Sequence, residues 1–260
     1  MGPKLSRDNM KKGIYIVPNL ITTTALFFGF ASLMSSFQGD FNKAAWAIML
    51  AGIFDMLDGK VARLTKTTSK FGIEYDSLSD LISFGIAPAM LAFTWALMPF
   101  GRSGWLAAFL YVVCAALRLA RFNVQSETVE KDKFKGLPSP GAAGMIAATV
   151  LFYYHLGGSG ALPEKHITLL LMVYSLAFLM VSNVGYWSSK DMGLGDRKPF
   201  SLLVISILVI ILVIAEPEVM LFVIGVVYAL SGPFEHMLKL IKRQFRTKKT
   251  KTKETETLKS

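Results

Sequence analysis

Long runs of apolar residues, separated by short polar connections, dominate this chain of 260 residues. A helix needs about 20 mostly apolar residues to cross a bilayer. We expect eight runs to form transmembrane helices: Val17–Phe37, Ala44–Arg63, Ser77–Met98, Ser103–Phe122, Gly141–Leu156, His166–Tyr186, Phe200–Ala215 and Val219–His236. The short connections favour an antiparallel bundle. The predicted fold class is therefore an all-α integral membrane protein, a polytopic helical bundle with about eight crossings.

The composition agrees with burial of most of the chain in a membrane. Hydrophobic residues make up 53% of the sequence and the mean hydropathy is +0.47, whereas a soluble domain of this size needs far more polar surface. The single cysteine, Cys114, lies inside an apolar run, which excludes a disulfide framework and a cysteine-based metal site. The first apolar run lacks a small-residue cleavage site, so we expect it to remain as the first helix.

The basic residues predict how the bundle is oriented. With eight crossings, all but three of the 28 Lys and Arg residues fall on the side that holds both termini; the exceptions are Lys43, Arg102 and Lys165. Cytoplasmic loops are enriched in Lys and Arg, so we expect a multi-pass protein of the cell membrane with both termini in the cytoplasm. Anionic lipid headgroups then account for the net charge of +10, and we expect no nucleic-acid partner.

Two pairs of aspartates flank the connection between the second and third expected crossings. Asp55 and Asp58 are three residues apart, so they share one face of a helix. Asp76 and Asp80 are four apart and also share a face, and the short connection lets the two faces meet near the cytoplasmic surface. Grouped carboxylates repel one another, and a hard divalent cation such as Mg²⁺ relieves that repulsion. Solvated loop acids or helix-start acids are the alternative, but they do not explain ionisable groups at the end of an apolar helix.

Small and basic residues follow the first acidic pair. Gly59 and Ala62 are three residues apart, and their size lets another helix or a flat ligand approach the backbone. Helix packing alone would account for either residue. Arg63 lies one turn beyond Gly59, where it can pair with a phosphate or extend to the interface.

The run from Asp55 to Asp80, D-x2-D-G-x2-A-R-x8-G-x3-D-x3-D, resembles the signature of the CDP-alcohol phosphatidyltransferase family at all eight defining positions. The resemblance implies a six-helix catalytic core, a homodimer, and two Mg²⁺ or Mn²⁺ ions at the cytoplasmic face. It implies that Asp55 and Asp76 contact both ions. Asp58 would contact one ion and Asp80 the other, and Asp80 would also act as the general base.

The same resemblance implies a site for the CDP-activated lipid. The segment Pro18-Asn19-Leu-Ile-Thr22 resembles the family's first-helix segment at the nucleotide site. The residues that we expect to bind the CDP-lipid are Asn19, Thr22, Gly59, Ala62, Arg63, Ser69 and Gly72.

Later segments resemble the phosphatidylserine synthase branch of the family: Arg118–Asn123, Phe134–Pro140 and Leu179–Asn183, with Lys190. This resemblance implies CDP-diacylglycerol and L-serine as substrates. Arg118 and Arg121 share a helical face, and their charge suits the serine carboxylate or the lipid diphosphate; anchoring at the cytoplasmic surface is the alternative. The residues expected to bind serine or phosphate are Arg118, Arg121, Asn123, Lys135 and Ser139.

The expected reaction transfers the phosphatidyl group of CDP-diacylglycerol to the serine hydroxyl, giving phosphatidylserine and CMP by metal-assisted direct displacement. The same chemistry with glycerol 3-phosphate or an inositol phosphate stays open, although such acceptors need a denser basic pocket. A divalent-cation transporter would place its acids near mid-membrane. A non-catalytic lipid-binding scaffold would function without the Asp80 carboxylate.

Four segments are expected along the chain. They are a cytoplasmic N-terminal segment over 1–16, the catalytic membrane core over 17–190, additional transmembrane helices over 191–238, and a basic cytoplasmic tail over 239–260. The tail is rich in Lys, Thr and Glu and lacks apolar periodicity, so we expect it to be disordered.

Overall fold

The computed structural model describes residues 7–65, 69–127, 136–186, 207–208, 211–235 and 237. The expected site residue Lys135, the basic tail over 239–260 and most of the expected crossing Phe200–Ala215 lie outside the described residues. Along the described chain, every named element is a helix.

Two long helices, α1 (Arg7–Phe37) and α2 (Phe41–Thr65), open the fold. Next comes one continuous helical rod over residues 70–100, composed of α3 (Lys70–Asp80), the wider π-helical turns of η1 (Leu81–Ile86), α4 (Ala87–Ala92), a second π-helical stretch η2 (Phe93–Leu97) and the 3-10 turn η3 (Met98–Phe100). The chain continues as α5 (Arg102–Glu127), α6 (Ser139–His155), α7 (Ile167–Val181) and a helix at Pro217–Glu235, which we call the last helix.

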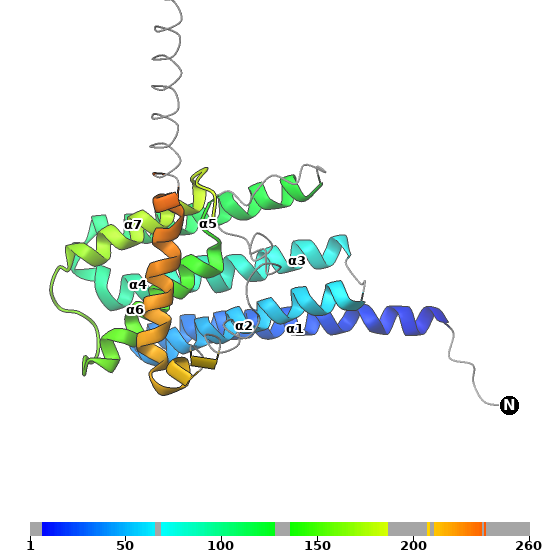
Figure 1. Cartoon of the computed structure of the whole chain (residues 1–260), viewed down its shortest axis with the longest axis horizontal. Helices are drawn as coiled ribbons and strands as arrows, with labels where there is room; N and C mark the ends of the chain where they lie inside the picture. Colours follow the sequence, from blue (N-terminus) through cyan, green and yellow to red (C-terminus); the bar gives the residue numbers. More distant parts are fainter. Residues whose placement is uncertain are drawn as a thin grey trace, which may run out of the picture.

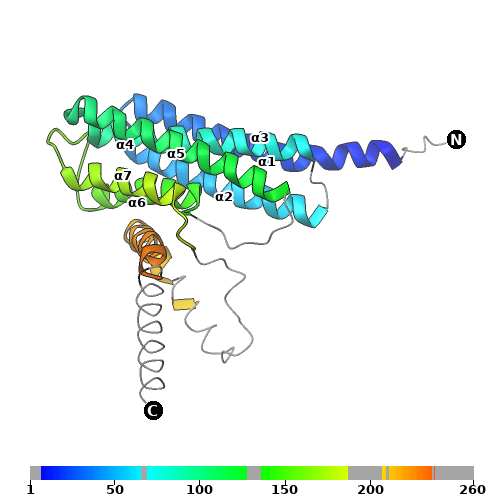
Figure 2. The ribbon, with the colours of Figure 1, turned by 90° about the horizontal axis from the view of Figure 1, so that it is seen from above.

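The helices form one elongated bundle. Figures 1 and 2 show α1, α2 and the rod running side by side along the long axis, with α5, α6 and α7 beside them. The last helix, drawn in orange in Figure 1, runs across this axis. It packs on α6, where the rings of Phe152 and Phe222 stack with their centroids 4.5 Å apart.

Four of the described helices are long and apolar enough to cross a membrane: Val17–Phe37, Lys70–Phe100, Arg102–Val124 and Pro217–Glu235. The chain is therefore a helical membrane protein, as its composition predicts, while the number of eight crossings stays a prediction. The helix that carries the second acidic pair begins at Lys70, before the expected start at Ser77. Asp76 and Asp80 consequently lie well inside a helix.

Small residues let the rod cross α1 closely. A Cβ atom at Gly29 would lie 2.8 Å from the Ser83 Cα, so this crossing requires glycine. The Ser83 hydroxyl donates to the Ala25 carbonyl at 3.2 Å, and one turn earlier the Ser79 hydroxyl donates to the Thr22 carbonyl at 3.3 Å. These contacts hold the acidic face of α3 at a set distance from α1.

A tyrosine on α5 complements a proline in the rod. Pro88 has no N–H for the carbonyl four residues earlier, which belongs to Phe84. The buried Tyr111 hydroxyl donates to that carbonyl at 3.3 Å. The bond ties α5, which carries the arginines predicted for the site, to the rod that carries Asp76 and Asp80.

Candidate active site

Three of the four predicted aspartates come together between α2 and α3. Carboxylate oxygens of Asp55, Asp76 and Asp80 lie within 4.8 Å of one another. All three side chains are half-buried, and the carboxyl groups of Asp55 and Asp80 are in hydrogen-bond contact. Helical spacing places each pair on one face, and the close crossing of the rod over α1 brings the second pair to the first.

Asp58 lies beside this cluster and bonds to α1. Its side chain is buried, and its Oδ2 accepts a hydrogen bond of 2.8 Å from the Thr22 hydroxyl. Asp58 still interacts electrostatically with Asp55 and Asp76. The bond from Thr22 thus holds the Asp58 carboxylate next to the three clustered carboxylates. It keeps the Oδ2 atom of Asp58 on the side of α1.

The cluster fits a divalent cation. Asp76 Oδ1 is buried and has no hydrogen-bond donor among the described residues. A buried carboxylate oxygen without a donor costs free energy, and the neighbouring carboxylates add repulsion. Mg²⁺ and Mn²⁺ prefer oxygen ligands of this kind and keep positions open for a phosphate. Asp55, Asp76 and Asp80, with Asp58 beside them, are the residues that could hold such an ion.

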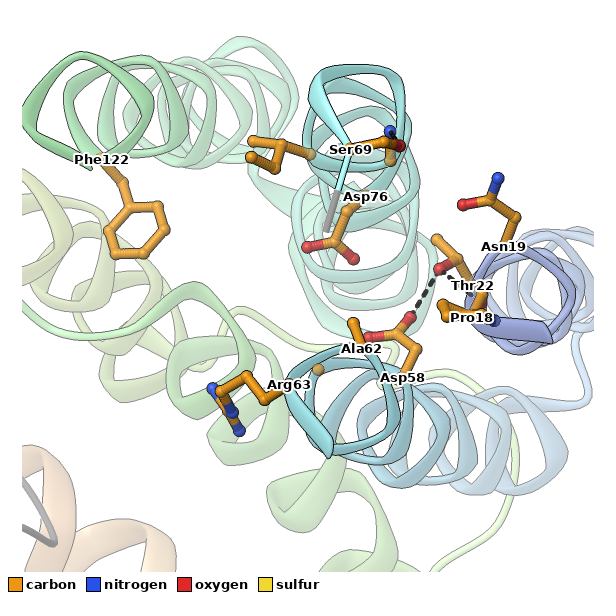
Figure 3. Close-up of a pocket in the computed structure, with 12 residues that line it drawn as sticks. Pro18, Asn19, Thr22, Asp58, Ala62, Arg63, Ser69, Asp76 and Phe122 are labelled. Carbon is orange, nitrogen blue, oxygen red and sulfur yellow. Dashed lines mark hydrogen bonds between the residues drawn. The ribbon is translucent and has the colours of Figure 1, made fainter. Parts of the chain in front are cut away.

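A pocket of about 320 Å³ opens next to the carboxylates, and α1, α2 and α3 line it (Figure 3). Figure 3 shows the carboxylates of Asp58 and Asp76 at this pocket, with Phe122 of α5 across from them. Every residue predicted for the CDP-lipid site lines the same pocket: Asn19, Thr22, Gly59, Ala62, Arg63, Ser69 and Gly72. The structure therefore brings these scattered positions together in one cavity.

The start of α3 shapes one wall of this pocket. Ser69 caps the helix, because its Oγ accepts a hydrogen bond of 3.0 Å from the Gly72 N–H. A Cβ atom at Gly72 would lie 3.2 Å from that Oγ and 3.5 Å from Asn19 Oδ1, so a side chain here would crowd the pocket. A helix N-terminus favours an anionic group such as a phosphate.

The two predicted arginines have different partners. Arg118 is half-buried and donates to Ser139 Oγ at 2.7 Å, and it interacts electrostatically with Asp80 and Asp55. Arg121 donates to the Val181 carbonyl at 3.2 Å, which is the last carbonyl of α7. Cations stabilise helix C-termini in this way. Arg118 therefore faces the acidic cluster, while Arg121 holds the end of α7.

The remaining predicted acceptor residues form contacts between helices. The Asn123 amide N–H donates to Ser77 Oγ at 3.0 Å, which joins α5 to α3 next to Asp76. Ser139 is fully buried at the start of α6. The chain reaches it through Gly136, which adopts φ +89° and passes so close to the Met180 carbonyl that no side chain would fit. Lys135 lies outside the described residues.

Sequence reasoning missed several residues of the site. Ser77 follows Asp76 directly, and this adjacency was the signal that could have found it. Ile73 and Phe122 line the pocket together with the predicted residues.

The sequence model of the CDP-alcohol phosphatidyltransferase family matches residues 15–181 of the chain. The chain belongs to this family. The match begins within α1, runs to the end of α7, and includes every described residue that lines the pocket or belongs to the acidic cluster. The chain is therefore a membrane-bound transferase of phospholipid biosynthesis.

Several curated family members are similar over much of the chain. A CDP-diacylglycerol–serine O-phosphatidyltransferase of Helicobacter pylori is 36% identical over 240 residues, which cover 91% of this chain and 98% of that protein. An archaetidylserine synthase of Methanothermobacter thermautotrophicus is 35% identical over 191 residues, covering 73% and 77%. A CDP-diacylglycerol–serine O-phosphatidyltransferase of Bacillus subtilis is 32% identical over 170 residues, covering 65% and 89%.

Proposed function

We propose that this CDP-alcohol phosphatidyltransferase is a phosphatidylserine synthase, which transfers the phosphatidyl group of CDP-diacylglycerol to the hydroxyl of L-serine and releases CMP. The observation that carries the proposal is the half-buried Arg118 guanidinium, which donates to Ser139 Oγ at 2.7 Å and interacts electrostatically with Asp80 and Asp55. An acceptor with its own carboxylate needs such a cation next to the reacting groups. Serine also stands in the names of all three relatives, whereas their lipid differs.

The acidic cluster supports divalent-metal dependence, and we infer two Mg²⁺ or Mn²⁺ ions. Asp55, Asp58, Asp76 and Asp80 are the residues that would hold them. Bound metal would supply positive charge that offsets the negative charge developing on the diphosphate and the departing CMP.

The donor takes the pocket between α1, α2 and α3 in this proposal. Its diphosphate lies near the N-terminus of α3, where backbone N–H groups favour an anion. Arg63 borders the same pocket and adds an exposed cation for the phosphates. The acyl chains extend from the pocket into the bilayer.

In the proposed step, the serine hydroxyl oxygen attacks the phosphorus that carries the diacylglycerol. Asp80 takes the hydroxyl proton as general base. The bond between that phosphorus and the CMP oxygen breaks, and CMP leaves with the electron pair. Arg118 binds the serine carboxylate and thereby points the hydroxyl at the donor. A single direct displacement inverts the configuration at phosphorus, whereas a covalent enzyme intermediate would retain it.

The charge distribution supports a cytoplasmic site, because both acidic pairs flank a connection that also carries Lys60, Arg63, Lys66 and Lys70. We propose that the termini and the site face the cytoplasm of a cell in whose membrane the enzyme acts as a homodimer. Serine and CMP are water-soluble, so a site at this surface lets them meet a lipid that stays in the bilayer.

A turnover assay tests the acceptor. Purified protein with CDP-diacylglycerol, Mn²⁺ or Mg²⁺ and labelled serine should yield CMP and labelled phospholipid in equal amounts. Arg118→Gln should raise the KM for serine at least tenfold, because it removes the cation that faces the carboxylate. Arg121→Gln is the matched control and should leave that KM close to the parent value. Turnover with glycerol 3-phosphate but not with serine would refute the proposed acceptor.

A further inference from the structure

Two neighbouring threonines of α1 bond the two helices that line the pocket with it. The Thr22 hydroxyl donates to Asp58 of α2 at 2.8 Å, and Thr23 Oγ1 lies 2.9 Å from the hydroxyl of Tyr75 on α3. The Thr22 bond holds a carboxylate beside the acidic cluster. The Thr23 bond instead holds a tyrosine that belongs neither to that cluster nor to the pocket lining.

The surroundings of Thr23 determine which of the two hydroxyls donates. Thr23 Oγ1 also lies 2.7 Å from the Asn19 carbonyl, and a hydroxyl has one proton to donate. The carbonyl can only accept, so the Thr23 proton goes to it and the Tyr75 hydroxyl donates to Thr23 Oγ1. The bonds form a chain from Tyr75 through Thr23 to Asn19, which lines the pocket.

The Tyr75 bond lies close to the start of α3. Tyr75 is nearer that start than Ser79 and Ser83, whose hydroxyls bond carbonyls of α1. About one turn before Tyr75, Gly72 faces the Asn19 side chain across a corner of the pocket (Figure 3), where a Cβ atom at Gly72 would lie 3.5 Å from Asn19 Oδ1. The Tyr75 hydroxyl therefore holds the first turn of α3, a wall of the pocket, against α1.

A second aromatic ring on α3 orients Tyr75. The rings of Phe71 and Tyr75 stack with their centroids 5.9 Å apart and an interplanar angle of 9°. Tyr75 occupies one of the open positions of the signature between Gly72 and Asp76, so the signature does not specify this residue. The bond to Thr23 thus belongs to this chain's own contact between α1 and α3.

We propose that Tyr75 is a positioning residue for the CDP-activated lipid, which holds the start of α3 at a fixed distance from Asn19 and thereby sets the width of the donor pocket. This inference rests on the part of the proposed function that puts the donor in this pocket, and not on the choice of acceptor. The donor diphosphate lies near the N-terminus of α3 in that proposal. A shift of the first turn would therefore move the N–H groups that face the diphosphate.

The test is an equilibrium titration of the purified protein with CDP-diacylglycerol in detergent and Mg²⁺, which measures the Kd of the donor without an acceptor. Tyr75→Phe removes the hydroxyl and keeps the ring on Phe71. It should raise this Kd about three- to tenfold, the loss expected for one hydrogen bond. Thr23→Val removes the other partner and should raise the Kd by a similar factor. Because both residues act through one bond, the double variant should have the Kd of either single variant.

Thr24→Val is the matched control. The Thr24 hydroxyl donates to the Leu20 carbonyl of its own helix at 2.9 Å, as the Thr23 hydroxyl does to Asn19. This variant therefore loses the same bond within α1 but no bond to α3, and it should keep the parent Kd. The KM for serine should keep the parent value in Tyr75→Phe, because Arg118 lies on α5 and its partner Ser139 on α6.

The possible failures can be told apart. If the parent protein binds CDP-diacylglycerol and Tyr75→Phe has the parent Kd, Tyr75 does not position α3 and the inference falls alone. Effects of Tyr75→Phe and Thr23→Val that multiply in the double variant, or an equal rise in the serine KM, would also overturn it. A parent protein that binds the donor but releases no CMP with serine refutes only the proposed acceptor, and the titration still decides the role of Tyr75. If the parent protein does not bind CDP-diacylglycerol, the proposed donor site and this inference fall together.

Discussion

Exchange of Gly29 for alanine should push the rod away from α1 and disturb the acidic cluster. The new methyl group would lie 2.8 Å from the Cα and 2.9 Å from the Cβ of Ser83, whereas carbon atoms in contact lie about 3.5–4.0 Å apart. The two helices must therefore separate by roughly 1 Å. The hydrogen bonds from Ser83 and Ser79 to α1 are already 3.2 and 3.3 Å long, so this separation breaks both.

The free energy of unfolding should fall by about 3 kcal/mol. Overpacking costs about 1–3 kcal/mol, and the two lost hydrogen bonds add about 0.5–1.5 kcal/mol each. Alanine returns about 1 kcal/mol through its better helix propensity. Gly52→Ala is the matched control, because its methyl group would meet the Phe84 ring at 3.8 Å, an ordinary contact. That variant receives the propensity gain without the clash.

Thermal unfolding in detergent, measured together with CMP release, checks this prediction. For a chain of this size, each kcal/mol shifts the midpoint by about 2–4 °C, so Gly29→Ala should lower it by about 6–12 °C. Its turnover should also fall at temperatures where it is folded, because Asp76 and Asp80 move relative to Asp55. If Gly29→Ala matches Gly52→Ala in both measurements, the close crossing does not hold the site together.

Three further predictions follow from the site and its supports. Asp80→Asn should lower kcat about 10²–10⁴-fold by removing the general base, while titration still detects Mn²⁺ binding; Glu74→Gln, on an exposed position of α3, should change neither value. Tyr111→Phe removes the donor to the Phe84 carbonyl and should lower the free energy of unfolding by about 1–3 kcal/mol in denaturation experiments. The Tyr174 hydroxyl donates to the exposed Ser103 carbonyl, so Tyr174→Phe should lower the free energy of unfolding by less than half of that amount. Chelation with EDTA should stop CMP release, and added Mg²⁺ or Mn²⁺ should restore it; full activity in EDTA would exclude metal dependence.

Local patterns in the sequence predict much of this site. A three- or four-residue spacing places both members of an acidic pair on one helical face, whatever the rest of the chain does. The signature from Asp55 to Asp80 predicts the carboxylates, and the residues expected for the CDP-lipid site all line one pocket. The apolar runs predict the helices, although the start of α3 at Lys70 lies earlier than hydropathy alone indicates. Serine capping at Ser69, rather than apolarity, determines that start.

Other features depend on how distant segments pack. Arg118 and Arg121 look equivalent in sequence, yet Arg118 faces the carboxylates and Arg121 bonds the end of α7. Asp58 bonds Thr22 of α1, and the last helix stacks Phe222 on Phe152 of α6. Helical periodicity places a side chain on a face of its own helix, but the neighbour of that face depends on contacts between residues far apart in the chain. Those contacts follow from close packing at positions such as Gly29 and Gly141, where a single methyl group would keep the helices apart.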